Sequence, residues 1–556
     1  MSTITFATAL HQLPSSNRAM LVAFVASALV TLALGVIFGA STGLVRAGLL
    51  DADPERGYRL MTAHGVTAFF YWLYFAQAAL LLAFAAVYGR PVPRLALAPA
   101  GWLGLLLMLA GLAANQLGTW LGAPLLYDGS PELVGADDRV MAGVFYLGYL
   151  LLGAGLVLLA TAAIATALAG KAEDGGRAWS AITFGTVAWA GLVMVSAVAT
   201  LNVFLPAALW AFGLGGEPTD HTTGWHLLFH NLHYLPLMGT VLAWYVLIRE
   251  MTGIGSILGE RFSKAIFTVY LVVVPPTSLY HMFLEPGLAP SVLALGSLLS
   301  LFIGVPTIAM FLVIVASLEA HARARGAIGL FGWLWLLPWQ EPAMAALGMA
   351  VLNLALGGTL AFVLIQEQLA SLLSDTFFVP GYFHFLTVGT VTLTLLAALT
   401  HLVPGLTGHA LRTPRLLSSL PYVITAGLVL LGVAGVAAGL TGMPRRMLDV
   451  GLAGAAPATW LTFSRLIATG GLIMAVGLLL YACALGGALV VGRRPAEGAI
   501  TARPALTASG PAPVRQAALT GPLSVVILVG AMYVMTVVAF ELSRALPLLV
   551  SGGGGH

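Results

Sequence analysis

The sequence predicts an all-α integral membrane protein with about thirteen transmembrane helices. Of its 556 residues, 59% are hydrophobic and only 8% are charged, and the mean hydropathy is +0.97. A chain of this composition cannot fold in water without exposing large apolar areas. The apolar residues also come in runs of about 20 or more, which is the length that an α-helix needs to cross a bilayer.

Each predicted span is an apolar run bounded by short polar segments. In chain order, the spans are 19–41, 59–88, 98–121, 141–168, 178–205, 224–248, 264–285, 290–316, 344–368, 380–404, 418–440, 461–492 and 522–542. No polar segment is long enough for a separate soluble domain, so we expect one membrane domain over residues 1–550. The proline-containing segment 493–521 is typical of a linker, and the glycine-rich end 551–556 is typical of a flexible tail.

Basic residues indicate the orientation of the chain. Most of the 24 lysines and arginines lie on the N-terminal segment or in loops that follow even-numbered spans. They are Arg18, Arg90, Arg94, Lys171, Arg177, Arg249, Arg261, Lys264, Arg323, Arg325, Arg412, Arg415, Arg493, Arg494, Arg503 and Arg515. Because basic loops stay in the cytoplasm, we expect the N-terminus inside and the C-terminus outside.

Net charge and cysteine content exclude several classes of protein. The net charge of +3 is small and follows from this topology, so no nucleic-acid partner is expected. Cys483 is the only cysteine. An internal disulfide and any metal centre held by several thiolates of this chain are therefore excluded.

Histidine is scarce, with 12 residues, and an imidazole inside a bilayer needs a partner. The second and tenth predicted spans both enter the membrane from outside, and they carry His64 and His384 at a similar depth. Two imidazoles at one depth can hold a heme iron between them. The sequence therefore predicts a heme site near the outer surface.

The sixth predicted span carries three further histidines, His226, His230 and His233, which are separated by four and three residues. This spacing forms one stripe on a helix, and a stripe can ligate one ion. His281 lies near the outer end of the seventh span. A single histidine of this kind is equally well explained by a hydrogen bond to a neighbouring carbonyl or hydroxyl. The shared depth of five of them favours metal or heme binding.

Two adjacent arginines, Arg445 and Arg446, lie in the outer loop beside this layer of histidines. Paired guanidinium groups can bind heme carboxylates through charge-assisted hydrogen bonds. An arginine pair in a loop is also compatible with a solvated position or a lipid headgroup contact. The location beside the histidines favours the first interpretation.

Together these residues resemble subunit I of the heme-copper oxidase superfamily, most closely its B-type (ba-type) branch, whose catalytic subunit has thirteen helices. The resemblance implies a low-spin heme, expected to be b-type, held by His64 and by His384 at the second position of a His-x-His pair. It also implies a bacterial or archaeal cytoplasmic membrane. The expected partners are lipid, small accessory membrane subunits and an outer-face electron-donor subunit of the cupredoxin or cytochrome c type.

The resemblance is incomplete at the oxygen-reducing centre. His230 and Tyr234 match the family's His-x-x-x-Tyr pattern for copper, but Tyr280 replaces one of two adjacent copper histidines and leaves only His281. Tyr382 replaces the histidine that would bind a high-spin heme. Copper is well served by three imidazoles, so His226, His233 or a Tyr280 phenolate would have to complete the set. Tyrosinate can ligate heme iron, as in catalase, so Tyr382 leaves a second heme open.

The family's proton path maps onto Tyr245 and Thr307, and Met310 interrupts it where a hydroxyl residue is usual. Tyr245 is equally well explained as an interfacial aromatic anchor. Two functions follow for the chain. One is an oxidoreductase that reduces oxygen or nitric oxide at a divergent heme and copper centre; the other is a non-catalytic homologue that keeps one heme as an electron relay or sensor. A transporter without redox cofactors is a distant third.

Overall fold

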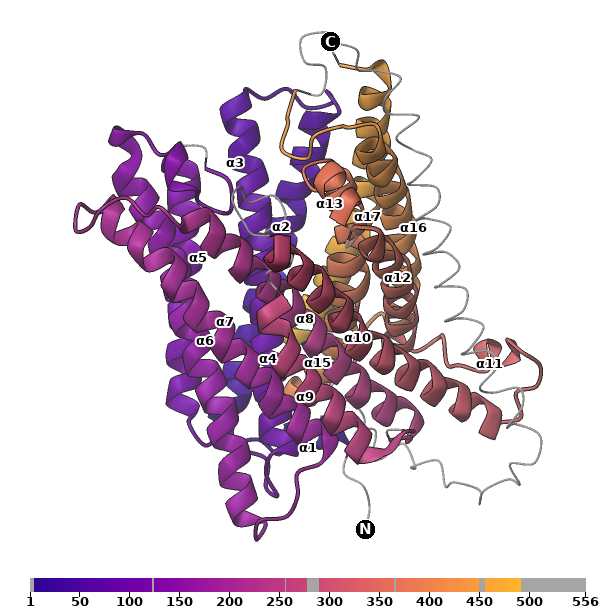
Figure 1. Ribbon diagram of the computed structural model, residues 1–556. Helices are drawn as coiled ribbons and strands as arrows, with labels where there is room; N and C mark the ends of the chain where they lie inside the picture. The colour runs from indigo at the N-terminus through magenta and orange to yellow at the C-terminus, as the bar shows by residue number, and fades with distance from the viewer. Residues whose placement is uncertain are drawn as a thin grey trace.

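The computed structural model describes residues 5–122, 125–255, 257–277, 290–364, 367–449 and 456–491. Apart from one isolated bridge between Thr376 and Pro444, regular structure in these segments is helical (Figure 1). The α-helices are α1 (Phe6–His11), α2 (Ser15–Arg46), α3 (Pro54–His64), α4 (Leu73–Tyr88), α5 (Ala98–Leu121), α6 (Arg139–Glu173), α7 (Ala181–Ala211), α8 (His221–Thr252), α9 (Gly259–Thr277), α10 (Pro290–Ala324), α11 (Gly332–Trp335), α12 (Pro342–Leu364), α13 (Glu367–Leu373), α14 (Phe378–His384), α15 (Leu393–Thr407), α16 (Pro414–Leu440) and α17 (Ala458–Val490).

The prediction of an all-α membrane protein is confirmed. In the described segments, 11 helices are long and apolar enough to cross a membrane. α9 overlaps the predicted span 264–285 up to Thr277, and the rest of that span lies outside the described residues. The predicted span 522–542, the linker 493–521 and the tail 551–556 lie outside the described residues. In Figure 1, α3 and α13 lie at one end of the bundle, called the α3 end below, and α1 lies at the opposite α1 end.

Glycines allow two of the long helices to pack closely. A Cβ atom at Gly118 of α5 would lie 2.6 Å from the Cβ of Phe145, and one at Gly111 would lie 2.6 Å from the carbonyl oxygen of Gly148 in α6. Small residues at such crossings let backbones approach inside a membrane, where water supplies no driving force for helix association. The resulting interface holds α5 and α6 as a rigid pair.

The two spans that carry His64 and His384 share one irregularity. In each, the α-helix ends at the histidine, and an eight-residue π-helix follows: η1 (Gly65–Trp72) after α3 and η5 (Phe385–Thr392) after α14. Such π-helical segments are rare and concentrate at functional sites. The last residues of the two segments are joined, because the indole Nε1 of Trp72 donates to Oγ1 of Thr392 at 3.0 Å.

A proline inside α8 explains one contact between this helix and its neighbour. Pro236 has no N–H, so the carbonyl of Leu232 lacks its usual partner within the helix. The buried hydroxyl of Tyr74 in α4 donates to this carbonyl at 3.1 Å. The polar group is therefore satisfied inside the bilayer, and α8 is held against α4.

Candidate functional site

The structure brings His64 and His384 together from opposite parts of the chain. Their imidazole rings are nearly parallel, at 7°, and the ring centroids are 6.5 Å apart. Both residues are held at the junction of an α-helix and a π-helix. The two ligands expected for a low-spin heme are thus neighbours in space, although 320 residues separate them in the chain.

Each of these rings is oriented by a backbone carbonyl. Nδ1 of His64 lies 2.8 Å from the carbonyl oxygen of Gly35 in α2, and Nδ1 of His384 lies 2.6 Å from that of Pro380. A carbonyl oxygen only accepts hydrogen bonds, so we assign the proton to Nδ1 in both rings. Nε2 then keeps its lone pair, which is the form of histidine that ligates a metal.

The space between the rings fits an axially ligated iron. An ion midway would lie about 3.2 Å from each centroid, which matches a metal–imidazole bond of roughly 2 Å plus the distance from nitrogen to ring centre. A glycine keeps the site open: a Cβ at Gly39 of α2 would lie 2.6 Å from the His64 ring. These residues therefore fit a heme with two histidine ligands.

The predicted arginines lie in the loop at the α3 end. Nη2 of Arg445 is 2.9 Å from Asp375, and Nη2 of Arg446 is 3.3 Å from Asp128. Burial disfavours the charge of Arg446, but Asp128, Tyr127 and Asp375 together raise the pKa of its guanidinium above the ordinary value. Arg446 therefore stays positively charged at any usable pH.

Arg46, at the end of α2, is a third arginine of this group that sequence reasoning missed. Its Nη2 donates to the carbonyl of Pro444 at 3.1 Å, and its guanidinium lies 4.6 Å from the ring centroid of Phe377. Within the described part of the chain, the Nε atoms of Arg46, Arg445 and Arg446 are buried without a hydrogen-bond partner. Unpaired buried donors of this kind fit an anionic group such as a heme carboxylate.

The histidines of α8 lie in different surroundings. His230 is buried, and its ring lies 4.7 Å from that of Tyr234. His233 instead packs among Phe69, Phe229 and Phe383, at centroid distances of 5.2, 4.1 and 4.5 Å. Residues three apart diverge by about 60° around a helix axis, which is enough to turn His233 toward this aromatic group.

The expected copper ligands are therefore not assembled by the described residues. His226 is half-buried one turn before His230, and among the residues that the structure describes no three His, Cys, Asp or Glu side chains converge on a metal position. Tyr280 and His281 lie outside the described segments. Within the described segments, this part of the site offers the imidazole of His230 and the phenol of Tyr234 beside it.

Tyr382 connects the two halves of the site. It precedes His384 by two residues, packs on Phe378 at 5.9 Å between ring centroids, and interacts electrostatically with Tyr234 and with Arg445. Its side chain also packs against the apolar cluster of Val363, Leu364 and Leu373. The arrangement offers a second iron a tyrosine oxygen as its only protein ligand in the family's position.

The predicted proton path is bonded to two residues that sequence reasoning missed. The hydroxyl of Tyr245 is buried, lies 2.8 Å from Oγ of Ser263 and donates to Sδ of Met310 at 3.3 Å. Oγ1 of Thr307 lies 2.9 Å from the hydroxyl of Tyr270. Ser263 and Tyr270 are seven residues apart on α9, a spacing that puts both on one face and could have been noticed.

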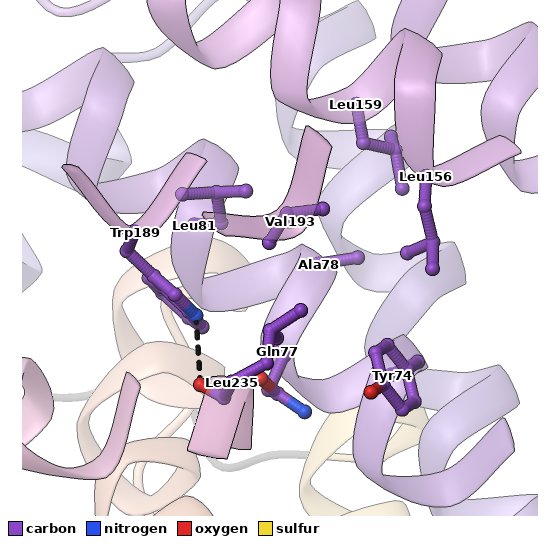
Figure 2. A pocket seen from close by; sticks show the side chains of 9 residues that line it. All are labelled: Tyr74, Gln77, Ala78, Leu81, Leu156, Leu159, Trp189, Val193 and Leu235. Atoms are coloured by element: carbon purple, nitrogen blue, oxygen red, sulfur yellow. Dashed lines mark hydrogen bonds between the residues drawn. The ribbon is translucent and has the colours of Figure 1, made fainter. Parts of the chain in front are cut away.

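A cavity elsewhere in the bundle is too small for a second heme. Figure 2 shows it between α4, α6, α7 and α8, where Nε1 of Trp189 donates to the carbonyl of Leu235 at 3.1 Å. Its volume is about 10 Å³, room for about one water molecule. The buried amide of Gln77 beside it has no hydrogen-bond partner among the described residues.

Comparison with known proteins agrees with this geometry. The family model described as "Cytochrome C and Quinol oxidase polypeptide I" matches residues 19–474. A cytochrome c oxidase subunit 1 of Thermus thermophilus is 29% identical over 500 residues, covering 85% of each chain. One of Alkalihalophilus pseudofirmus is 27% identical over 248 residues, covering 40% of this chain and 36% of the relative.

A solved structure shares the fold. It is that of a heme-copper terminal oxidase dimer, with a TM-score of 0.80, 21% identity, and coverage of 94% of this chain and 92% of the other. Members of this family bind hemes and copper, and they work in a membrane with other subunits. The chain is a cytochrome c oxidase subunit I-like membrane protein and belongs to the heme-copper oxidase family.

Proposed function

We propose that this chain carries electrons through a low-spin, b-type heme held by His64 and His384 to a divergent second centre beside Tyr382 and Tyr234, where oxygen or nitric oxide is reduced. The observation that carries the proposal is the parallel pair of imidazoles 6.5 Å apart. When bound, such a heme accepts and releases one electron at a time. A relay of this kind needs a second centre or a partner to receive the electron.

The chain's own residues have separate tasks in this proposal. The carbonyls of Gly35 and Pro380 hold both rings in the metal-binding tautomer. Arg46, Arg445 and Arg446 offset the charge of the heme carboxylates at the α3 end. Phe383 lies between Tyr382 and His384 in the chain, and its ring packs against His233. This packing keeps water out of the space between the two centres.

At the second centre, the position of Tyr382 supports a high-spin heme with a tyrosine oxygen ligand. A phenolate favours ferric iron and lowers the reduction potential of a heme. Tyr234, four residues after His230, supports oxygen over nitric oxide as the substrate, and the thirteen predicted spans support placement nearest the B-type branch.

A relay or sensor without catalysis is the second candidate. Two features favour it. His230 and His233 face different neighbours, and Tyr382 stands where the family has a histidine. The two candidates differ in composition and activity. Heme analysis of the purified protein, metal analysis and oxygen consumption with an artificial donor should give two hemes and turnover for the first, and one heme without turnover for the second.

For the surroundings of the chain, we propose an electron-donor subunit of the cupredoxin or cytochrome c type at the α3 end, with small accessory membrane subunits. The arginine group at this end and the heme histidines below it support entry from that side. We also propose that the α1 end is cytoplasmic. A reporter enzyme that works only in the cytoplasm should be active when it is fused after Arg18. A reporter enzyme that works only after export should be active when it is inserted into the loop 212–220.

A further inference from the structure

The proposed proton path has a chemical gap at Met310. Proton transfer along a chain of groups requires that each one both accepts and donates a proton. The hydroxyl of Tyr245 meets a hydroxyl at Ser263 but a thioether at Met310. A thioether accepts a hydrogen bond weakly and has no proton to give. A path up α10 through Met310 therefore stops there.

Tyr270 of α9 offers a hydroxyl next to this gap. Its side chain is fully buried, and its hydroxyl lies 2.9 Å from Oγ1 of Thr307, one turn from Met310 on α10. It interacts electrostatically with Tyr245 on one side and with Tyr234 on the other. The phenol is therefore within electrostatic range of both tyrosines of α8.

The chemistry of its partner separates Tyr270 from the structural tyrosines of the bundle. Tyr74 and Tyr149 end on the backbone carbonyls of Leu232 and Tyr127, which accept but cannot donate. Tyr270 meets the hydroxyl of Thr307, and either oxygen can be the donor. A pair of that kind can reverse its direction, which is what a proton relay needs.

We propose that Tyr270 is a proton-relay residue that leads protons around Met310, from Ser263 and Tyr245 through Tyr270 and Thr307 to Tyr234. The inference rests on the proposed function, since the protons are destined for the second centre. Each hydroxyl takes up one proton and releases its own, so every residue of the path ends unchanged. The net event is one proton taken from water at the α1 end, which would balance the charge of one electron that arrives at the second centre.

The test measures proton uptake without turnover. The intact protein with its hemes is reduced anaerobically in a stopped-flow instrument by hexaammineruthenium(II), an outer-sphere donor that releases one electron and no proton. A pH dye in weak buffer follows proton uptake, and heme absorbance follows electron arrival. The variants are Tyr270→Phe, Tyr270→Phe with Met310→Thr, and the control Tyr481→Phe, a fully buried tyrosine on α17.

We expect Tyr270→Phe to slow proton uptake by about tenfold or more while reduction of the low-spin heme keeps its rate. Adding Met310→Thr puts a hydroxyl in the direct path and should restore uptake to within about twofold of the parent, which a merely structural role for Tyr270 would not produce. Tyr481→Phe should behave like the parent.

Unchanged uptake in Tyr270→Phe, or a double variant as slow as the single one, would overturn the inference. So would a parent protein that takes up no protons on reduction. Failure of the proposed function has a different signature, because it appears as a missing low-spin heme spectrum or as absent oxygen consumption in the parent protein.

Discussion

The two halves of the candidate site differ in how completely their ligands are prepared. On the His64 side, two imidazoles are parallel, each ring nitrogen Nδ1 is tied to a carbonyl, and Gly39 leaves room beside them. On the His230 side, the neighbouring imidazole of His233 turns into an aromatic group, and Tyr382 stands where a histidine is expected. The first half therefore holds both proposed ligands in the orientation that a heme would need.

The two halves have different requirements, because one would only carry electrons and the other would also reduce a substrate. A heme that only carries electrons needs two ligands held in place, and α2, α3 and α14 position the two histidines proposed for that role. Reduction of a substrate also needs an open metal position and a proton supply. At the second centre, one metal-binding side chain can replace another, and the chemistry of the centre changes with the replacement.

Removing either imidazole of the prepared half should have the largest effect. His64→Ala or His384→Ala is expected to abolish the low-spin heme spectrum, because one ligand alone leaves the iron five-coordinate and weakly held. Reduced-minus-oxidised absorbance spectra measure it. The control His226→Ala should keep the low-spin bands. A full low-spin spectrum in both alanine variants would refute the assignment.

Changing Tyr382→His tests the other half. An imidazole in place of a phenolate should raise the reduction potential of a second heme by roughly 0.1 V or more, since the axial ligand is the main determinant of heme potential. Potentiometric titration followed in the Soret band measures the shift. No change in any heme potential would mean that Tyr382 does not ligate iron.

A methyl group at Gly39 should disturb the prepared half without removing a ligand. The Cβ of Gly39→Ala would lie 2.6 Å from the His64 ring, so the ring must tilt, at a cost of about 1–3 kcal/mol. Electron paramagnetic resonance of the ferric low-spin heme reports the angle between ligand planes. Gly43→Ala is the matched control. Gly43 lies one turn further along α2, and a Cβ added there would lie 3.7 Å from its nearest neighbouring atom.

The smallest effect is expected from the arginines. Arg446→Gln should weaken heme retention by about 1 kcal/mol, the loss of one charge-assisted hydrogen bond in a partly exposed loop. Because the pKa of Arg446 is raised above an already high value, its contribution is present at every pH below that range, and heme retention should not vary between pH 6 and 9 through this residue. Heme dissociation rates in detergent measure both the effect of Arg446→Gln and the pH dependence. The prediction would be contradicted if heme retention fell across this pH window in the parent protein but not in the variant.

Hydropathy alone determined the helices, because each apolar run of bilayer length must close its backbone hydrogen bonds within itself. The expected topology also predicted that His64 and His384 lie at one depth, since both spans are expected to enter the membrane from the same side. The family resemblance then supplied the roles expected of Tyr234 and Tyr382. The span 522–542 stays a prediction.

Only the tertiary structure decided what each side chain meets. The carbonyl of Gly35 at His64, the arrival of Arg46 beside Arg445, the turn of His233 toward Phe383 and the pairing of Tyr270 with Thr307 join residues of different helices or loops. Helix periodicity limits which face a residue occupies, but rotation and crossing of the helices select its partner. Those depend on the packing of the whole bundle, which no single stretch of sequence contains.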